Sequence, residues 1–278
     1  MRQLKSQMQN LLRKAGIYQR VKASALYDLY WGIADRQILT ERAREVDFYR
    51  SVLKGFRKGD LIFDIGANQG QKTDVFLRLG ARVVAVDPDD FNQKILGEKF
   101  HSYRLVKKPV SVVGKAVSDR DAIETLWIDE PGSAKNTLNP KWVETLRADA
   151  TRFGNTLNFA QKKSIETITL DSLIAEHGRP TFVKIDVEGH EVQVVRGLTK
   201  PVPYLSFEVN LPEFLNEGQE CVKLLARLDP RSKFNFVADC QRGLALDQWI
   251  PEEAFLKALR DCKNTSIEVF WNAATLDA

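Results

Sequence analysis

The chain has 278 residues, of which 44% are hydrophobic and 28% charged, proportions that are ordinary for a globular protein and exclude a disordered or fibrous one. It has no uninterrupted apolar run of about eighteen residues, so we expect no transmembrane helix. The formal net charge of +4 is uneven: residues 1–58 carry 13 Lys/Arg against 5 Asp/Glu, whereas the remainder carries 28 against 32. The basic character therefore belongs to the N-terminal segment.

The expected compartment is a reducing cytoplasm. The basic N-terminus lacks the continuous apolar core of a secretory signal. The three cysteines, Cys221, Cys240 and Cys262, are widely spaced, which is not typical of a disulfide framework or a zinc site.

Residues 1–58 are predicted to form a helical segment ahead of a main domain at 59–278. The first 22 residues contain six Lys/Arg, no acidic residue and apolar residues at helical spacing. This pattern indicates either peripheral contact with the anionic inner face of a membrane or packing on the main domain or on a second copy of the chain. Residues 24–58 are expected to cap the ligand site of the main domain.

From residue 61 onward the pattern alternates between strand and helix. Main strands are predicted at 61–67, 82–90, 110–119, 181–189 and 204–210, helices at 72–80, 91–100, 190–198 and 221–228, an extra strand at 124–130 with a helix from about 141, and late strands at 234–240 and 266–272 around a helix at 252–261. Repeated strand–helix units predict an α/β fold with a doubly wound, mostly parallel sheet and late strands at one edge. Ligands of such folds bind beyond the carboxyl ends of the strands.

The first strand runs into the sequence DIGANQG (64–70). Gly66 and Gly70 allow a tight turn before a helix, yet their spacing matches neither the dinucleotide fingerprint nor the P-loop, which disfavours a nicotinamide dehydrogenase. Asp64 at the strand end is placed to attract a cation or ammonium. A ligand with a carboxylate, an ammonium and a sulfonium, such as S-adenosylmethionine, suits this environment better than a dinucleotide.

Two further strand ends carry polar residues. Asp87 follows Gly66 by 21 residues, close to the offset of the acid that binds ribose hydroxyls in nucleotide-binding folds. Ser118 and Asp119 end the third strand and are candidates for contact with an adenine edge. Polar residues at successive strand ends indicate a cofactor site.

These motifs, with AVDPD (85–89), AVSD (116–119), VKIDVEGHE (183–191) and LSFEVN (205–210), resemble the FkbM-type methyltransferases in order and spacing. The resemblance implies a class I, Rossmann-like methyltransferase fold, S-adenosylmethionine as methyl donor, and O-methylation of a hydroxyl on a sugar, a glycan precursor or a related natural product. It assigns to the cofactor pocket Asp64, Gly66, Asn68, Gly70, Asp87 and Asp119, and to the transfer site Asp186, Glu188 and His190.

The segment VKIDVEGHE provides candidate acid–base groups. Methyl transfer to a hydroxyl requires a nearby base, and His190 is the predicted one, with Glu188 or Asp186 orienting it or binding substrate hydroxyls. Glu208 and Asn210, at the next strand end, are predicted to bind substrate. The main hypothesis needs no metal, although Asp186, Glu208 and Asn210 form an alternative set of oxygen ligands for a divalent ion.

The expected partner is a small-molecule or glycan acceptor, as in polysaccharide biosynthesis. The acidic balance of the main domain offers no broad basic face for nucleic acid. A catalytically inactive scaffold with the same fold is the alternative function. Lys184 shares a strand face with Asp186, so a charge pair between them is expected.

Overall fold

The computed structural model describes residues 36–101, 110–148, 157 and 159–274. Its elements, in chain order, are α4 (Arg36–Val52), β1 (Leu61–Ile65), α5 (Gln71–Leu79), β2 (Arg82–Val86), α6 (Asp90–Lys99), β3 (Val110–Val113), β4 (Ala116–Val117), β5 (Ile123–Ile128), α8 (Pro140–Ala148), β6 (Gln161–Ile168), α9 (Leu170–His177), β7 (Phe182–Ile185), α10 (Glu191–Arg196), β8 (Tyr204–Asn210), α11 (Leu215–Leu228), β9 (Lys233–Val237), the 3₁₀ helix η1 (Cys240–Arg242), α12 (Glu252–Asp261) and β10 (Ser266–Asn272).

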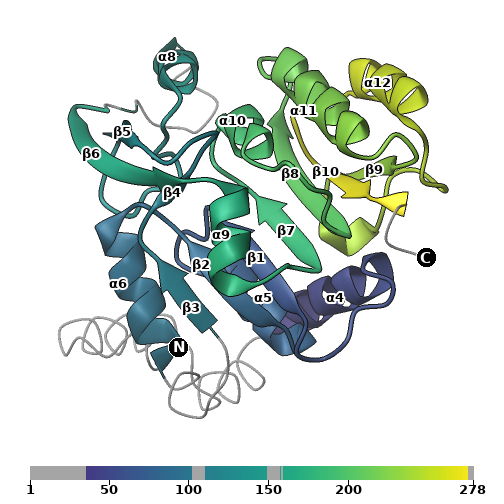
Figure 1. Ribbon diagram of the computed structural model, residues 1–278, viewed down its shortest axis with the longest axis horizontal. Helices are drawn as coiled ribbons and strands as arrows, with labels where there is room; N and C mark the ends of the chain where they lie inside the picture. Colours follow the sequence, from purple (N-terminus) through teal and green to yellow (C-terminus); the bar gives the residue numbers. More distant parts are fainter. Residues whose placement is uncertain (1–35, 102–109, 149–156, 158, 275–278) are drawn as a thin grey trace.

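Seven strands form the central sheet, in the order β3-β2-β1-β7-β8-β10-β9 (Figure 1). Every neighbouring pair is parallel except those of β10, which runs antiparallel to both β8 and β9. The predicted mostly parallel sheet with late strands at one edge is therefore confirmed. Strand β10 lies between β8 and β9. Strand order reverses between β1 and β7, and ligands of such sheets bind beyond the strand ends at that point.

Helices cover both faces of this sheet, as Figure 1 shows. One apolar cluster joins the sheet to α9, α10, α11 and α12, and another joins it to α4, α5 and α6. Strand β7 is buried along its whole length because its alternate residues face the two clusters: Val183 and Ile185 face one, and Phe182 the other. Lys184 is thus a charged residue on a covered strand.

Helix α4 belongs to the same packed unit as the sheet. Tyr49 is fully buried and contacts the rings of Phe76, Phe182 and Phe270. Residues 36–53 therefore share the core of the domain that was predicted to begin at residue 59. Residues 1–22, with their predicted membrane contact, lie outside the described residues. Within the described ranges, no helix has the length and apolarity that crossing a membrane requires.

The predicted third strand, 110–119, is divided in two. Strand β3 pairs with β2, but after Gly114 and Lys115 the chain leaves the main sheet and β4 pairs with β6 in a second sheet, of order β4-β6-β5. Most of β6 was not predicted. Residues 161–166 contain a single hydrophobic side chain, Ile165, and the other five side chains are polar. Alternation cannot be seen in so polar a strand.

Candidate functional site

Two cavities lie at the carboxyl edge of the main sheet, and Asp186 lines both. The β2 cavity, of about 100 Å³, is bounded by the turn after β1, the end of β2 and the segment 186–190. The β10 cavity, of about 470 Å³, is bounded by α4, the end of β8 and the start of β10.

The turn after β1 forms one wall of the β2 cavity. The amides of Gly66 and Ala67 both donate to the carbonyl of Val86, at 2.9 and 3.0 Å. Gly66 has φ +78°, and a Cβ there would lie 1.8 Å from the backbone oxygen of Asp186. Only glycine allows the chain to turn this close to β7. Asn68 also lines the cavity, and its amide donates to Asp87 Oδ2 at 2.8 Å.

Asp64 and Gly70 were predicted to line the cofactor pocket; the structure places them next to the β2 cavity without bordering it, and their contact with a cofactor stays a prediction. Asp64 is 1% exposed and accepts a hydrogen bond from Thr73 Oγ1 at 2.5 Å, and burial raises its pKa even though Lys184 acts in the opposite direction. Gly70 begins α5 with φ +73°, where a Cβ would meet Phe100 and Leu96. Neither residue borders the β2 cavity as described.

Asp87 lies at the wall of the β2 cavity and is held by three donors. Its carboxylate accepts from the amides of Asn68 and Asp89 and from Asn92 Nδ2, at 2.8, 3.0 and 3.1 Å. Burial raises the pKa of Asp87 to about 6, although these hydrogen bonds lower it. The Asn92 carboxamide oxygen is buried in the same wall and has no partner among the described residues. Sequence reasoning missed Asn92, whose only signal is its place one turn into the helix after Asp87.

His190 also borders the β2 cavity, where the structure pairs it with Ser118. The Ser118 hydroxyl lies 3.0 Å from Glu124 Oε1 and 3.1 Å from His190 Nε2. If the hydroxyl donates to Glu124, Nε2–H donates to the hydroxyl and Nδ1 keeps its lone pair. Burial lowers the pKa of His190, while Glu124 and Asp119 act in the opposite direction. Burial thus favours the neutral form of the ring.

The hydrogen bond of His190 differs from the prediction that Asp186 or Glu188 would orient it. The side chain of Glu188 accepts instead from Trp142 Nε1 at 3.0 Å. Asp119 lies on the surface side of Ser118, with Arg120 Nε 4.0 Å away, and does not border the β2 cavity as described.

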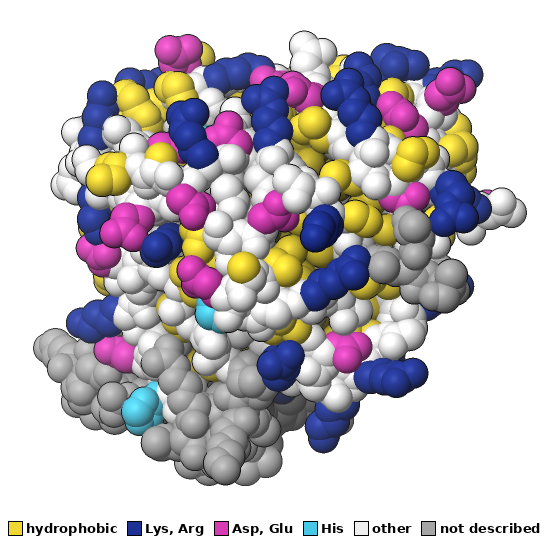
Figure 2. Space-filling view, in the orientation of Figure 1, with side chains coloured by type: hydrophobic (Ala, Val, Ile, Leu, Met, Phe, Trp, Pro, Cys, Tyr) yellow, Lys and Arg dark blue, Asp and Glu magenta, His cyan; other side chains and the backbone are white. Residues whose placement is uncertain are grey.

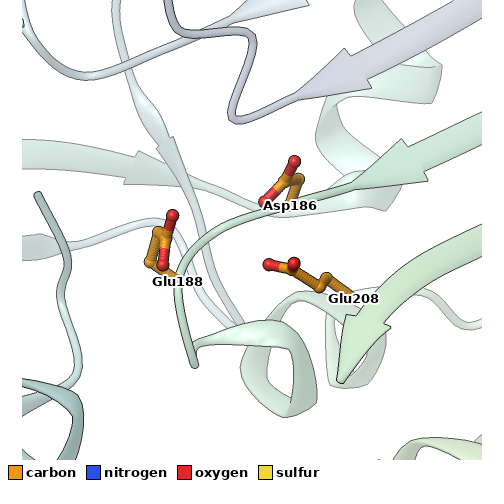
Figure 3. A group of neighbouring side chains, drawn as sticks. All are labelled: Asp186, Glu188 and Glu208. Atoms are coloured by element: carbon orange, nitrogen blue, oxygen red, sulfur yellow. The ribbon is translucent and has the colours of Figure 1, made fainter. Parts of the chain in front are cut away.

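Asp186, Glu188 and Glu208 point toward one another (Figure 3), with ligand oxygens all within 4.8 Å. Lys184 Nζ donates to Asp186 Oδ2 at 2.7 Å, which confirms the expected charge pair. Burial opposes ionisation of Asp186, but the Lys184 ammonium holds its pKa below the ordinary value. Burial and the neighbouring carboxylates raise the pKa of Glu188 well above its usual range and that of Glu208 to about 7.

This carboxylate cluster has the chemistry to hold a divalent ion, since hard cations prefer oxygen ligands. Its members differ from the alternative set named from the sequence: Glu188 takes the place of Asn210, which donates to Glu208 Oε2 at 3.4 Å. Lys184 already occupies one oxygen of Asp186 and supplies a positive charge. The expectation that the reaction needs no metal stays a prediction.

A loop between β5 and α8 bridges the β2 cavity. Gly132 N and Asn136 Nδ2 donate to Asp89 Oδ2 at 2.9 and 2.7 Å. At its other end, Thr137 Oγ1 donates to the carbonyl of Glu188 at 2.8 Å. The loop therefore joins the end of β2 to the turn after β7.

Comparison with known proteins gives one match to a curated relative. The chain shares 23% identity over 216 residues with the hexuronic acid methyltransferase AglP of Haloferax volcanii, covering 76% of this chain and 75% of that protein.

Solved structures resemble the chain more distantly. A TehB-like SAM-dependent methyltransferase from Corynebacterium glutamicum has 8% identity and a TM-score of 0.42, covering 87% of this chain and 96% of that one. A SAM-dependent O-methyltransferase from Thermotoga maritima has 13% identity and a TM-score of 0.39, covering 83% and 64%. Likeness at this level carries no argument of its own.

The family match is extensive. Residues 64–233, well over half of the chain, match the family described as the methyltransferase FkbM domain. That range holds the glycine turn, Asp87 and the segment 183–191, which are the features that shape the β2 cavity. The chain is a methyltransferase and belongs to the FkbM family.

Proposed function

We propose that this protein transfers a methyl group from S-adenosylmethionine to a hydroxyl of a sugar, a glycan precursor or a related natural product. The observation that carries the proposal is the pair of cavities meeting at Asp186, one bounded by the glycine turn and Asp87 and the other open for a second molecule. The curated relative acts on a hexuronic acid, which supports a sugar acceptor.

The residues of the β2 cavity fit this cofactor. Asp87 has accepting capacity left for a ribose hydroxyl, since an ionised carboxylate offers about four acceptor sites and three donors occupy it. The unpartnered oxygen of Asn92 would take a second hydroxyl, because a buried acceptor without a donor is costly. Gly66 leaves room where any side chain would meet β7. When bound, S-adenosylmethionine supplies an electrophilic methyl group.

The proton of the acceptor hydroxyl must leave as the new C–O bond forms. His190 is the proposed proton acceptor at Nδ1, because its Nε2 is engaged with Ser118 and burial favours the neutral ring. Asp186 would bind a hydroxyl of the acceptor because it borders both cavities. Glu188, with an oxygen within 4.8 Å of Asp186, would assist it. Correct placement of the hydroxyl contributes much of the rate.

Calorimetry tests the cofactor assignment directly. S-adenosylmethionine and NAD are titrated separately into the full chain, and we expect saturable binding of the first and none of the second. Transfer of a radiolabelled methyl group to a panel of methyl glycosides then tests the reaction. Binding of NAD alone would contradict the proposal, as would labelling of nitrogen-containing acceptors in preference to hydroxyls.

The proposed cytoplasmic location and possible contacts of residues 1–22 concern a part of the chain outside the described residues. On the described residues of the face in Figure 2, basic and acidic side chains are interspersed, which supports the proposal that nucleic acid is not the substrate. Sedimentation with anionic liposomes, comparing the full chain with one lacking residues 1–22, tests membrane contact. Equal binding of the two proteins to the liposomes would contradict membrane contact through residues 1–22. Light scattering would report self-association of the full chain.

A further inference from the structure

The β10 cavity lies next to the β2 cavity, which is the proposed donor site. Asp186 borders both cavities, and the end of β8 and the start of β10 form the floor of the second one. Its volume is about 470 Å³, against about 100 Å³ for the β2 cavity. Glu41, Arg42 and Glu45 of α4 close one side.

The floor of this cavity carries two glutamates side by side. Glu208 and Glu268 are directly opposite each other across the antiparallel pair β8–β10. Ser266 Oγ donates to Glu208 Oε1 at 2.7 Å, and Ser206 Oγ donates to Glu268 Oε1 at 2.6 Å. Each serine engages one oxygen, and the second oxygens lie 3.4 Å from Asn210 Nδ2 in Glu208 and 3.9 Å from Cys240 Sγ in Glu268. In its ionised form each carboxylate has lone pairs left to accept further hydrogen bonds. Paired carboxylates of this kind are suited to hydroxyl donors.

The cations of the cavity already have carboxylate partners. Lys72 donates to Glu45, and Lys184 donates to Asp186 at 2.7 Å. Arg42 lies 3.9 Å from Asp74. The lining contains six Asp/Glu against three Lys/Arg, so a negatively charged ligand would enter a site with an excess of its own charge. Like-charge contacts are one of the ways in which a site discriminates against the wrong ligand.

We propose that the β10 cavity binds the methyl acceptor and that this acceptor is a sugar without an acidic group, either neutral or amine-bearing. The proposal rests on the function proposed above and names the substrate class of its second site. Glu268 and Glu208 accept hydrogen bonds from sugar hydroxyls, and the acidic excess rejects a uronic acid. In this the chain differs from its curated relative, which acts on a hexuronic acid.

The test compares matched methyl glycosides in the radiolabelled transfer assay: glucoside with glucuronide, galactoside with galacturonide, and a glucosaminide. We expect the neutral or amino member of a pair to have a kcat/KM at least ~10-fold above that of its uronide, the discrimination expected of one unfavourable charged contact. Equal or better transfer to a uronide would overturn the proposal. If the protein binds S-adenosylmethionine but labels no glycoside, the acceptor proposal is overturned as well, while the cofactor assignment stands.

Variants of the floor locate the site. Glu268→Gln should raise KM for the favoured glycoside by ~10-fold and narrow the discrimination against its uronide, with the Kd for S-adenosylmethionine unchanged. The exposed Glu253 on α12, changed to Gln, is the matched control. If Glu268→Gln yields little folded protein, Ser206→Ala, which releases one oxygen of Glu268, should move KM in the same direction. Unchanged KM and unchanged discrimination in a folded variant would contradict the assignment.

Absence of S-adenosylmethionine binding is a separate result. It would contradict the proposed function itself, and the acceptor assignment would fall with it. Calorimetry on the unmodified chain therefore precedes the glycoside comparison.

Discussion

The two cavities that meet at Asp186 are built in different ways. One wall of the β2 cavity is formed by two short stretches of chain, 65–68 and 86–92, whose backbone amides and tight turns set its shape, and the rest comes from residues 115–117, 126, 133–138 and 186–190. The β10 cavity is formed by charged side chains from α4, α5, β7, β8 and β10, which are far apart in the sequence. The comparison teaches that one wall of the β2 cavity is set by local sequence, whereas the β10 cavity depends throughout on packing between distant elements.

The largest expected effect follows from breaking the backbone geometry of the β2 cavity. Gly66→Ala places a Cβ 1.8 Å from the Asp186 carbonyl at a residue with φ +78°, so the turn and β7 must separate. We expect loss of S-adenosylmethionine binding in calorimetry and a lower midpoint of thermal unfolding.

Gly97→Ala, in α6, is the control for this change. A Cβ there meets nothing within 4 Å, and alanine in a helix is favoured by roughly 0.5–1 kcal/mol. It should bind S-adenosylmethionine normally and unfold at the same or a higher temperature. Normal cofactor binding by Gly66→Ala would show that the turn is not part of the cofactor site.

The second effect concerns His190, at the boundary of the β2 cavity. His190→Ala should lower turnover by ~10²–10⁴-fold while leaving the Kd for S-adenosylmethionine nearly intact. Because burial lowers the pKa of His190, turnover of the unmodified protein should fall on the acid side only below the ordinary histidine pKa of about 6.5. His177→Ala, on α9, is the control, and full activity of His190→Ala would exclude His190 as the base.

A smaller effect concerns the turn that separates the cavities. Glu191 accepts from the amides of Val187 and Gly189, both at 3.2 Å, and burial raises its pKa to about 8. The folded protein therefore binds this proton more tightly than the unfolded chain, whose glutamate titrates near 4.5. The stabilisation from the protonated form is complete below pH 4.5 and is lost as pH rises toward 8.

Glu191→Gln should remove this dependence. Urea unfolding at pH 5, 6.5 and 8 should show the free energy of unfolding of the unmodified protein falling, relative to the variant, by an amount on the order of a few kcal/mol. Glu220→Gln, at an exposed ion pair with Arg196, should not change the pH dependence. Parallel curves for the unmodified protein and Glu191→Gln would contradict the buried, protonated carboxyl.

The smallest expected effect comes from metal removal. Lys184 already pairs with Asp186 inside the carboxylate cluster, so we expect turnover to stay within about two-fold after exhaustive chelation, since no step depends on a Lewis acid. Turnover measured before and after chelation checks this. Activity that is lost on chelation and restored by Mg²⁺ or Mn²⁺ would instead establish Asp186, Glu188 and Glu208 as a metal centre.

Features that depend on neighbouring residues could be predicted from the sequence. Alternating buried strands, helix-ending glycines and the turn at Gly66 follow from periodicity and backbone freedom, and β8 and α12 have the expected bounds. The charge pair of Lys184 follows from two residues on one strand face.

Features that depend on packing between distant elements could not be predicted from the sequence. The partner of His190 is Ser118, 72 residues away, and the pairing of Glu208 with Glu268 requires β10 to insert beside β8. Asn92 carries no motif of its own, and its role depends on a helix that turns its side chain back toward Asp87. No local pattern contains these relations.

The position of α4 has a consequence for how such enzymes diversify. The family match covers residues 64–233. Most of the wall of the β10 cavity comes from outside that range, including Glu41, Glu45, Cys240 and Glu268. In the proposed assignment, the shared segment thus lines the donor cavity, and the flanking segments supply most of the wall of the acceptor cavity. We therefore expect that exchanging both flanking segments between relatives, while the shared segment is kept, would change which acceptor is methylated.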